Sequence, residues 1–306
     1  MFYIDDFLNH LKAKNYNQKN TIKAYHLILN EFSCFCDERN IYSVKQLTEN
    51  NVIGYLECIK EKGISDRYFY LKLYRLRIYF NFLYEEGYIF FAFLKDYIFP
   101  KYLRNNFPVL AQTEIKNILE AIKVKDTLCS KGKTILELMY SSALRPSEVC
   151  KLKIFDIDFK EKQLFIQQSK CKKDRIVPIG KIALDLITEY IHNTRRRYLK
   201  SHSPGNIFLS LKSGLPHNSY GIRWVIRETL KRSGFNPIKP YSLRATSATV
   251  LFLNGMGIAH INKLLGHADF TTTRIYLRVN EMNLKKVLDK HHPRIKLNIK
   301  EEKYDI

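Results

Sequence analysis

Apolar residues recur every three or four positions along the first hundred residues of the chain. The spacing is clearest over residues 4–11, 25–35, 52–59 and 73–83, and each stretch would place its apolar side chains on one face of an α-helix. Gly87 stands where the last of these helices would end. The pattern predicts an N-terminal region composed of helices alone.

The rest of the chain combines helical and strand-like patterns. Two short alternating runs, 163–168 and 174–179, favour strands, and residues 170–174 between them are typical of a hairpin turn. Helical spacing occurs in the segments 112–121, 133–143, 183–200, 219–233, 242–254, 258–265 and 284–290. This order predicts a mainly α fold with a small antiparallel β-sheet in its second part.

A linker-like stretch over residues 99–108 separates the two regions, because two prolines and a pair of asparagines interrupt the helical patterns. We place a domain boundary there, which predicts a helical domain over residues 1–105 and an α+β domain over residues 106–306. The charge changes at the same point: residues 1–108 carry a net charge of +3 and residues 109–306 carry +18.

The whole chain has 51 Lys and Arg residues against 30 Asp and Glu residues, a net charge of +21. Such an excess repels itself in a compact protein, which points to a polyanionic partner such as nucleic acid. A membrane surface would also attract it, but no apolar run approaches the roughly 20 residues that cross a bilayer. The first residues lack the features of a signal peptide, so we expect a cytoplasmic protein without a membrane anchor.

Two smaller patterns bear on function. The six cysteines are scattered and form no CxxC pair, which favours reduced thiols and gives no support to a zinc site. Lys72, Arg75 and Arg77 lie among tyrosines in the helical segment 65–87. This combination suits contact with a phosphate backbone, and the alternative is a solvated face over an aromatic core.

A set of basic and phenolic residues in the second region forms a candidate reaction centre: Arg145, Lys170, Arg244, His267 and Tyr276. Guanidinium groups can neutralise the non-bridging oxygens of a phosphate, and a tyrosine hydroxyl can attack it to form a covalent intermediate. The set therefore suits phosphoryl transfer without a metal. Each residue alone also has a structural explanation, such as the pairing of Arg145 with Glu148 at a helix start.

The order and spacing of three blocks carry more information than the residue types. The blocks are Ala143-Leu-Arg145-Pro-Ser-Glu148, Leu243-Arg244-Ala-Thr-Ser-Ala-Thr249, and Leu265-Gly-His267 followed by Thr272-Thr-Arg-Ile-Tyr276. They closely resemble the tyrosine recombinases, the lambda-integrase family, and Lys170 matches the family's hairpin lysine. The closing Lys290-His-His-Pro293-Arg looks like the end of the Xer subgroup, whose members resolve chromosome dimers.

The resemblance implies a helical, DNA-clamping core-binding domain followed by a catalytic domain, the two forming a C-shaped clamp on DNA. It also implies that Tyr276 attacks the scissile phosphate to form a 3′-phosphotyrosyl bond and free a 5′-hydroxyl. Arg145 and Arg244 would bind the non-bridging oxygens, and Lys170 would protonate the leaving 5′-oxygen. The covalent link conserves the bond energy, so the reaction needs no ATP, metal or other cofactor.

The chain departs from the family pattern at two positions. The family commonly has His three residues before its second arginine, where this chain has Tyr241, and His directly after it, where this chain has Ala245. Tyr241 keeps a hydroxyl that can donate to a phosphate oxygen or orient the nucleophile, but it cannot act as an imidazole base. His267 becomes the candidate to contact the phosphate or to accept the proton of Tyr276.

The leading hypothesis is an Xer-like recombinase acting on double-stranded DNA in chromosome or plasmid dimer resolution. The resemblance implies a homo- or hetero-tetramer joined by exchange of C-terminal tails, and it allows for an activating partner protein. One alternative is an integrase or invertase of a mobile element; the lack of an arm-binding domain before Met1 mildly favours the Xer role. A DNA-binding regulator that has lost catalysis is disfavoured by the retention of the five residues.

Overall fold

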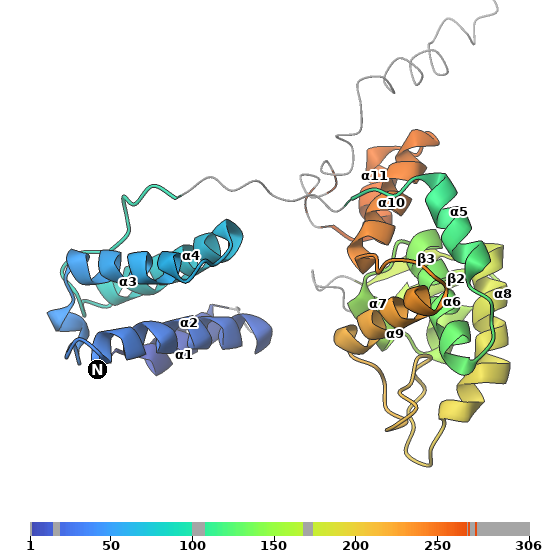
Figure 1. The fold of residues 1–306 in the computed structure, drawn as a ribbon, viewed down its shortest axis with the longest axis horizontal. Helices are drawn as coiled ribbons and strands as arrows, with labels where there is room; N and C mark the ends of the chain where they lie inside the picture. The colour runs from blue at the N-terminus through green and yellow to red at the C-terminus, as the bar shows by residue number, and fades with distance from the viewer. Residues whose placement is uncertain are drawn as a thin grey trace, which may run out of the picture. The chain divides into compact units, whose positions relative to one another are not determined.

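The computed structural model describes residues 2–14, 19–99, 108–167, 174–267, 269 and 273. The chain divides into two compact units, Met1–Asn105 and Asn106–Ile306, at the linker that carries the prolines and the asparagine pair. Figure 1 shows the first unit as helices and the second as helices with a small sheet. The predicted fold class, mainly α with a small antiparallel sheet, is confirmed.

The regular elements in the described part of the first unit are all helices. Its elements are α1 (Ile4–Ala13), α2 (Lys19–Asp37), the short 3-10 turn η1 (Val44–Gln46), α3 (Glu49–Glu61) and α4 (Asp66–Glu85). Polar side chains cap the N-termini of two of these helices. Thr48 and Asn51 exchange hydrogen bonds at the start of α3, and the hydroxyl of Ser65 accepts from the N–H of Tyr68 in α4.

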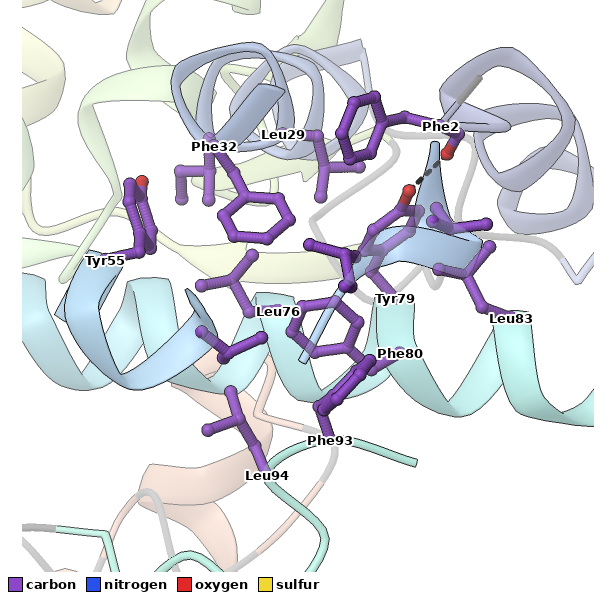
Figure 2. Close-up of a cluster of buried hydrophobic side chains, with 14 of the residues drawn as sticks. Phe2, Leu29, Phe32, Tyr55, Leu76, Tyr79, Phe80, Leu83, Phe93 and Leu94 are labelled. Atoms are coloured by element: carbon purple, nitrogen blue, oxygen red, sulfur yellow. Dashed lines mark hydrogen bonds between the residues drawn. The ribbon is translucent and has the colours of Figure 1, made fainter. Parts of the chain in front are cut away.

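Aromatic side chains from all four helices fill the core of this unit. Figure 2 shows Phe32 beside Phe80, whose rings meet edge to face with their centroids 5.6 Å apart. The hydroxyl of Tyr79, which is 1% exposed, donates to the carbonyl oxygen of Phe2. Because its one buried polar group is paired, Tyr79 can pack as a hydrophobic residue in this core.

Basic residues of α4 form ion pairs, hydrogen bonds and ring contacts within their own unit. Lys72 is 3% exposed, and its ammonium lies 2.6 Å from a carboxylate oxygen of Glu31. Arg77 donates to the carbonyl oxygen of Tyr97, and its guanidinium lies 3.9 Å from the ring centroid of Phe99. The interpretation of Lys72 as a phosphate contact is therefore wrong, because its buried ammonium already pairs with Glu31, 41 residues away in the sequence.

The second unit is built around α6. Its described elements are α5 (Gln112–Ala121), α6 (Thr127–Ser141), α7 (Pro146–Lys151), η2 (Ile154–Asp156), β1 (Ile157–Asp158), β2 (Gln163–Ile166), β3 (Arg175–Pro178), α8 (Lys181–Glu189), η3 (Tyr190–Thr194), η4 (Arg195–Tyr198), α9 (Ser219–Arg232), α10 (Pro240–Leu253) and α11 (Ile258–Leu265). Helix α6 contacts α5, α7, α8, α9 and α10. At Gly132 it approaches α9 so closely that a Cβ atom would lie 1.9 Å from Thr229 Oγ1.

The strands form one antiparallel sheet in the order β1-β2-β3. Leu164 faces Val177 across the β2–β3 pair, and both are fully buried. Arg175, at the start of β3, faces Ile166. The predicted strands are thus present, whereas most of the hairpin turn and the predicted helix 284–290 lie outside the described residues.

The segment predicted as one helix over residues 183–200 is not uniform. It runs as α8 to Glu189 and then continues as the π-helical η3 and the 3-10 η4. Arg195 in η4 is buried, and its guanidinium donates to the carbonyl oxygens of Asn206 and Pro204. Across the described parts of both units, no helix combines the length and apolar character needed to cross a membrane.

Candidate active site

The site begins at the junction of α6 and α7. Arg145 occupies the N-cap position of α7, and Pro146 follows at the first helical position, where its fixed backbone angle suits a helix start. The N–H of Arg145 donates to Glu148 Oε2 at 2.8 Å, and its Nη1 donates to Glu148 Oε1 at 2.8 Å. The predicted pairing of these two residues is confirmed.

Glu148 forms ion pairs with more than one arginine. Arg175 donates to both oxygens of its carboxylate, at 2.8 and 2.9 Å, in a bidentate pair. Arg244 Nη1 lies 3.9 Å from Glu148 Oε2. The Glu148 side chain is 4% exposed, and burial alone would raise the pKa of its carboxyl. The hydrogen bond and charge of Arg175 outweigh burial and, with Arg145 and Arg244, lower the pKa to about 2.

Arg244 is the fifth residue of α10 and is 1% exposed. Its guanidinium donates to the carbonyl oxygens of Ala143 and Leu265 and lies 3.2 Å from His267 Nε2. Ala143 adopts a positive φ of 50°, which is uncommon for a residue with a Cβ atom. Arg244 therefore joins the end of α6, the start of α10 and the end of α11.

Gly266 ends α11 in the left-handed conformation, with φ 60°. Its carbonyl oxygen accepts from Arg145 Nη2 at 3.3 Å. A Cβ atom at this position would lie 3.0 Å from Arg175 Cδ and 3.1 Å from its Nε. Both the backbone angle and the close approach of Arg175 therefore favour glycine directly before His267.

His267 is partly buried among cations. Its Nε2 faces Arg244, and its Nδ1 lies 2.8 Å from Thr273 Oγ1. Burial and the nearby positive charges of Arg244, Arg145 and Arg175 lower the pKa of this imidazole to about 3. His267 is therefore neutral at pH 7. The cluster then holds three guanidiniums and one carboxylate, and its excess positive charge suits an anionic group such as a phosphate.

Comparison with known protein families decides the identity of this arrangement. The profile of the phage integrase family matches residues 108–283, which is more than half of the chain. The chain belongs to the phage integrase family. The profile of the family's N-terminal SAM-like domain matches residues 4–87, so the helical first unit also has a counterpart among phage integrases. The resemblance to tyrosine recombinases is confirmed.

Curated members of the family align with nearly the whole chain. The tyrosine recombinase XerC of Halalkalibacterium halodurans is 32% identical over 298 residues, covering 95% of this chain and 97% of that relative. The tyrosine recombinase XerD of Listeria innocua is 30% identical over 294 residues, covering 95% of this chain and 98% of that relative. These matches place the chain among the Xer-like tyrosine recombinases.

Solved structures of this family share the fold. A Tn1549 transposon integrase in complex with a circular intermediate DNA matches with a TM-score of 0.74 at 16% identity, covering 95% of this chain and 99% of that one. The XerH site-specific recombinase bound to its difH substrate matches with a TM-score of 0.67 at 20% identity, covering 88% of this chain and 78% of that one. At these identities, the likeness establishes the fold.

The structure brings together three of the six residues singled out from the phage-integrase-like motifs: Arg145, Arg244 and His267. Tyr241 lies in the first turn of α10, three residues before Arg244, and is 37% exposed. Lys170 and Tyr276 lie outside the described residues, so their roles stay predictions.

Three site residues were missed from the sequence. Arg175 was interpreted only as part of the strand motif, yet from the start of β3 it donates hydrogen bonds to the carboxylate of Glu148. Asn262 and Thr273, which contact each other and the segment around His267, carried no signal beyond their place near the motif. In the described part of the chain, no group of three or more His, Cys, Asp or Glu residues is placed to hold a metal ion.

Proposed function

We propose that this phage integrase family member is an Xer-like site-specific recombinase that cuts and rejoins double-stranded DNA through a 3′-phosphotyrosyl intermediate on Tyr276. The observation that best supports the proposal is the set of three guanidiniums, Arg145, Arg175 and Arg244, gathered at one buried carboxylate. Their excess positive charge is suited to a transition state that carries more negative charge than the DNA phosphodiester.

The proposed reaction exchanges one ester for another. The hydroxyl of Tyr276 gives its proton to solvent, and its oxygen attacks the phosphorus. The bond to the 5′-oxygen breaks, and Lys170 gives that oxygen a proton. Arg145 and Arg244 bind the non-bridging oxygens during the exchange. A 5′-hydroxyl from another strand reverses the step, so the bond energy is conserved and neither ATP nor a metal ion is consumed.

The exposed face of α9 supports DNA as the partner. Exposed aromatic and basic side chains follow one another at helical spacing along this face: Tyr220, Arg223, Trp224, Arg227 and Lys231. Basic side chains can neutralise phosphates, and aromatic side chains supply flat apolar contact area. We propose that this face contacts DNA beside the cleavage site.

The extent of the match to XerC and XerD relatives favours dimer resolution on a chromosome or plasmid, in the cytoplasm, over a mobile-element role. We further propose a tetramer on DNA, joined by exchange of the C-terminal segment after Asn280. A chain truncated after Asn280 should then bind one half-site normally but bind two half-sites without cooperativity. Unchanged cooperativity on full-site DNA would contradict tail exchange.

Covalent trapping on genomic DNA tests the proposed function. The protein is incubated with fragmented DNA from its host, the reaction is stopped with SDS, and protein-linked ends are sequenced. A recombinase should yield adducts at one or a few sites with two inverted half-sites around a short spacer. Binding without any covalent adduct would support the alternative of a silent DNA-binding regulator. Adducts confined to the ends of a mobile element would support an integrase role.

A further inference from the structure

Asn262 and Thr273 both lie beside His267, and neither has a role in the proposed reaction. Asn262 lies in the last turn of α11 and is 8% exposed; Thr273 is fully buried. Thr273 is three residues before Tyr276 in the sequence. Both residues are hydrogen-bonded to His267.

The amide of Asn262 has a single consistent orientation. Its Nδ2 donates at 3.1 Å to the carbonyl oxygen of His267, which can only accept. The amide oxygen, Oδ1, therefore faces the other way, toward Thr273 Oγ1. Since Oδ1 can only accept, the hydroxyl of Thr273 donates to it.

The hydroxyl of Thr273 has one proton, and it is used in the hydrogen bond to Asn262 Oδ1. The same oxygen lies 2.8 Å from His267 Nδ1, so Nδ1 must donate and must carry a proton. On the other side of the ring, Nε2 lies 3.2 Å from Arg244 Nη2, and a guanidinium nitrogen can only donate. A neutral ring protonated at Nδ1 satisfies both contacts, whereas a proton on Nε2 would face another N–H group.

We propose that Asn262 and Thr273 are positioning residues that hold His267 as the neutral Nδ1–H tautomer, so that its Nε2 accepts a hydrogen bond from Arg244. The guanidinium of Arg244 is then fixed from two directions, by the imidazole and by the backbone carbonyls of Ala143 and Leu265. His267 acts as an acceptor for Arg244 rather than as the proton acceptor for Tyr276.

The charges around the ring support the neutral form. Guanidiniums act on it from three elements, Arg145 at the start of α7, Arg175 at the start of β3 and Arg244 in α10. The carboxylate of Glu148, which pairs with Arg145 and Arg175, opposes their effect. With burial they lower the pKa of His267 to about 3, against 6.5 for the free side chain. A proton from Tyr276 would have to enter a site that already holds these cations.

The effect on the rate of DNA cleavage rests on the proposed function, whereas the tautomer of His267 does not. The tautomer itself is measured on the DNA-free protein. Two-bond ¹H–¹⁵N correlation spectra of ¹⁵N-histidine-labelled protein at pH 7 distinguish a protonated ring nitrogen from a bare one. The chain has nine histidines, and the signal of His267 is the one lost in His267→Gln. We expect one protonated nitrogen, Nδ1, and a bare Nε2.

Thr273→Val removes the hydroxyl at nearly constant volume, and Thr273→Ser retains it. The Val variant should lose the Nδ1–H preference and cleave a nicked suicide substrate about 10-fold more slowly, because a buried hydrogen-bonding group is left without its partner. The Ser variant should keep both properties. The matched control is Thr229→Val, since Thr229 is fully buried on α9 and its hydroxyl has no hydrogen-bond partner in the described structure.

An Nε2–H tautomer or an imidazolium in the wild-type spectrum at pH 7 would overturn the inference. So would a Thr273→Val variant that keeps the wild-type tautomer and cleavage rate. Wild-type protein that shows the Nδ1–H tautomer but never forms a covalent adduct with DNA would contradict the proposed function instead. The two failures are therefore distinguishable.

Discussion

Replacing Glu148 by Gln tests whether one carboxylate holds the arginine cluster together. Glu148→Gln keeps the size of the side chain but removes the charge that Arg145, Arg175 and Arg244 share. An amide can still accept on one side, but its NH₂ group must face a guanidinium on the other. The variant therefore leaves buried positive charge without compensation.

The magnitude follows from the pKa of the carboxyl. A pKa lowered from 4.5 to about 2 corresponds to about 3 kcal/mol in favour of the ionised form in the folded protein. The cost of removing one partner from a buried ion pair, about 3–5 kcal/mol, is consistent with this value. At pH 7 we expect Glu148→Gln to lower the free energy of unfolding of the second unit by about 3 kcal/mol.

The loss should depend on pH in a defined direction. Because the pKa of Glu148 is lower in the folded than in the unfolded state, its stabilisation is complete above about pH 4.5 and is lost as the pH falls toward 2. The difference between wild type and Glu148→Gln should shrink by about 1.4 kcal/mol between pH 7 and pH 3.5. Titration of other groups, His267 among them, is common to both proteins and largely cancels in this difference.

Urea unfolding followed by the fluorescence of Trp224 measures the effect. Trp224 is the single tryptophan of the chain and lies on α9, so its signal reports the second unit. The matched control is Glu120→Gln, because Glu120 forms an exposed pair with Lys116 at 3.9 Å and should change stability little. A Glu148→Gln midpoint equal to that of the control, or a loss that does not vary with pH, would refute the shared-carboxylate explanation.

Three further predictions concern the site and its DNA partner. Gly266→Ala should destabilise the second unit and slow cleavage more than Gly234→Ala, since both glycines have positive φ but only Gly266 has a side chain against its Cβ position; equal effects by Trp fluorescence and suicide-substrate cleavage would contradict the close approach. Arg227→Ala should reduce the slope of log K, the DNA-binding constant, against log salt concentration by about 1 in binding titrations. Arg232→Ala should leave the slope unchanged, because Arg232 already pairs with Asp126 and Glu228 in its own unit. Lys170→Ala should slow cleavage of ordinary DNA far more than cleavage of DNA with a 5′-bridging sulfur, whose thiolate leaves without a proton; equal loss on both substrates would refute the general-acid role.

The sequence predicted those features that depend on local periodicity or on motif order. Helical spacing located α2 and α9, because an amphipathic helix needs only one apolar face to be recognised. The motif order predicted that Arg145, Arg244 and His267 meet. Arg244 lies 3.2 Å from His267 Nε2, and Arg145 donates to the carbonyl oxygen of Gly266, the residue before His267. These predictions required no knowledge of distant packing.

The features that were missed depend on contacts between residues far apart in the chain. Lys72 was read as a surface cation, but Glu31 lies 41 residues away and holds it in the core. Arg175 and Glu148 are separated by 27 residues, and nothing in either segment shows that the first residue of a strand reaches a helix start. The change from α8 to π- and 3-10-helical turns accompanies the burial of Arg195 against loop carbonyls, which periodicity does not reveal.

The most direct test of the account is to identify the residue that becomes linked to DNA. A nicked suicide substrate carrying the target site traps the intermediate, and trypsin then releases the modified peptide for mass spectrometry. Cleavage after Arg274 and Arg278 gives a four-residue peptide, 275–278, that contains Tyr276 and no other hydroxyl-bearing residue. If Tyr276 is the nucleophile, this peptide carries the nucleotide, and Tyr276→Phe binds the site with wild-type affinity but forms no SDS-resistant adduct. A nucleotide on any other peptide, or an adduct formed by the Phe variant, would contradict the assignment of Tyr276 as the nucleophile.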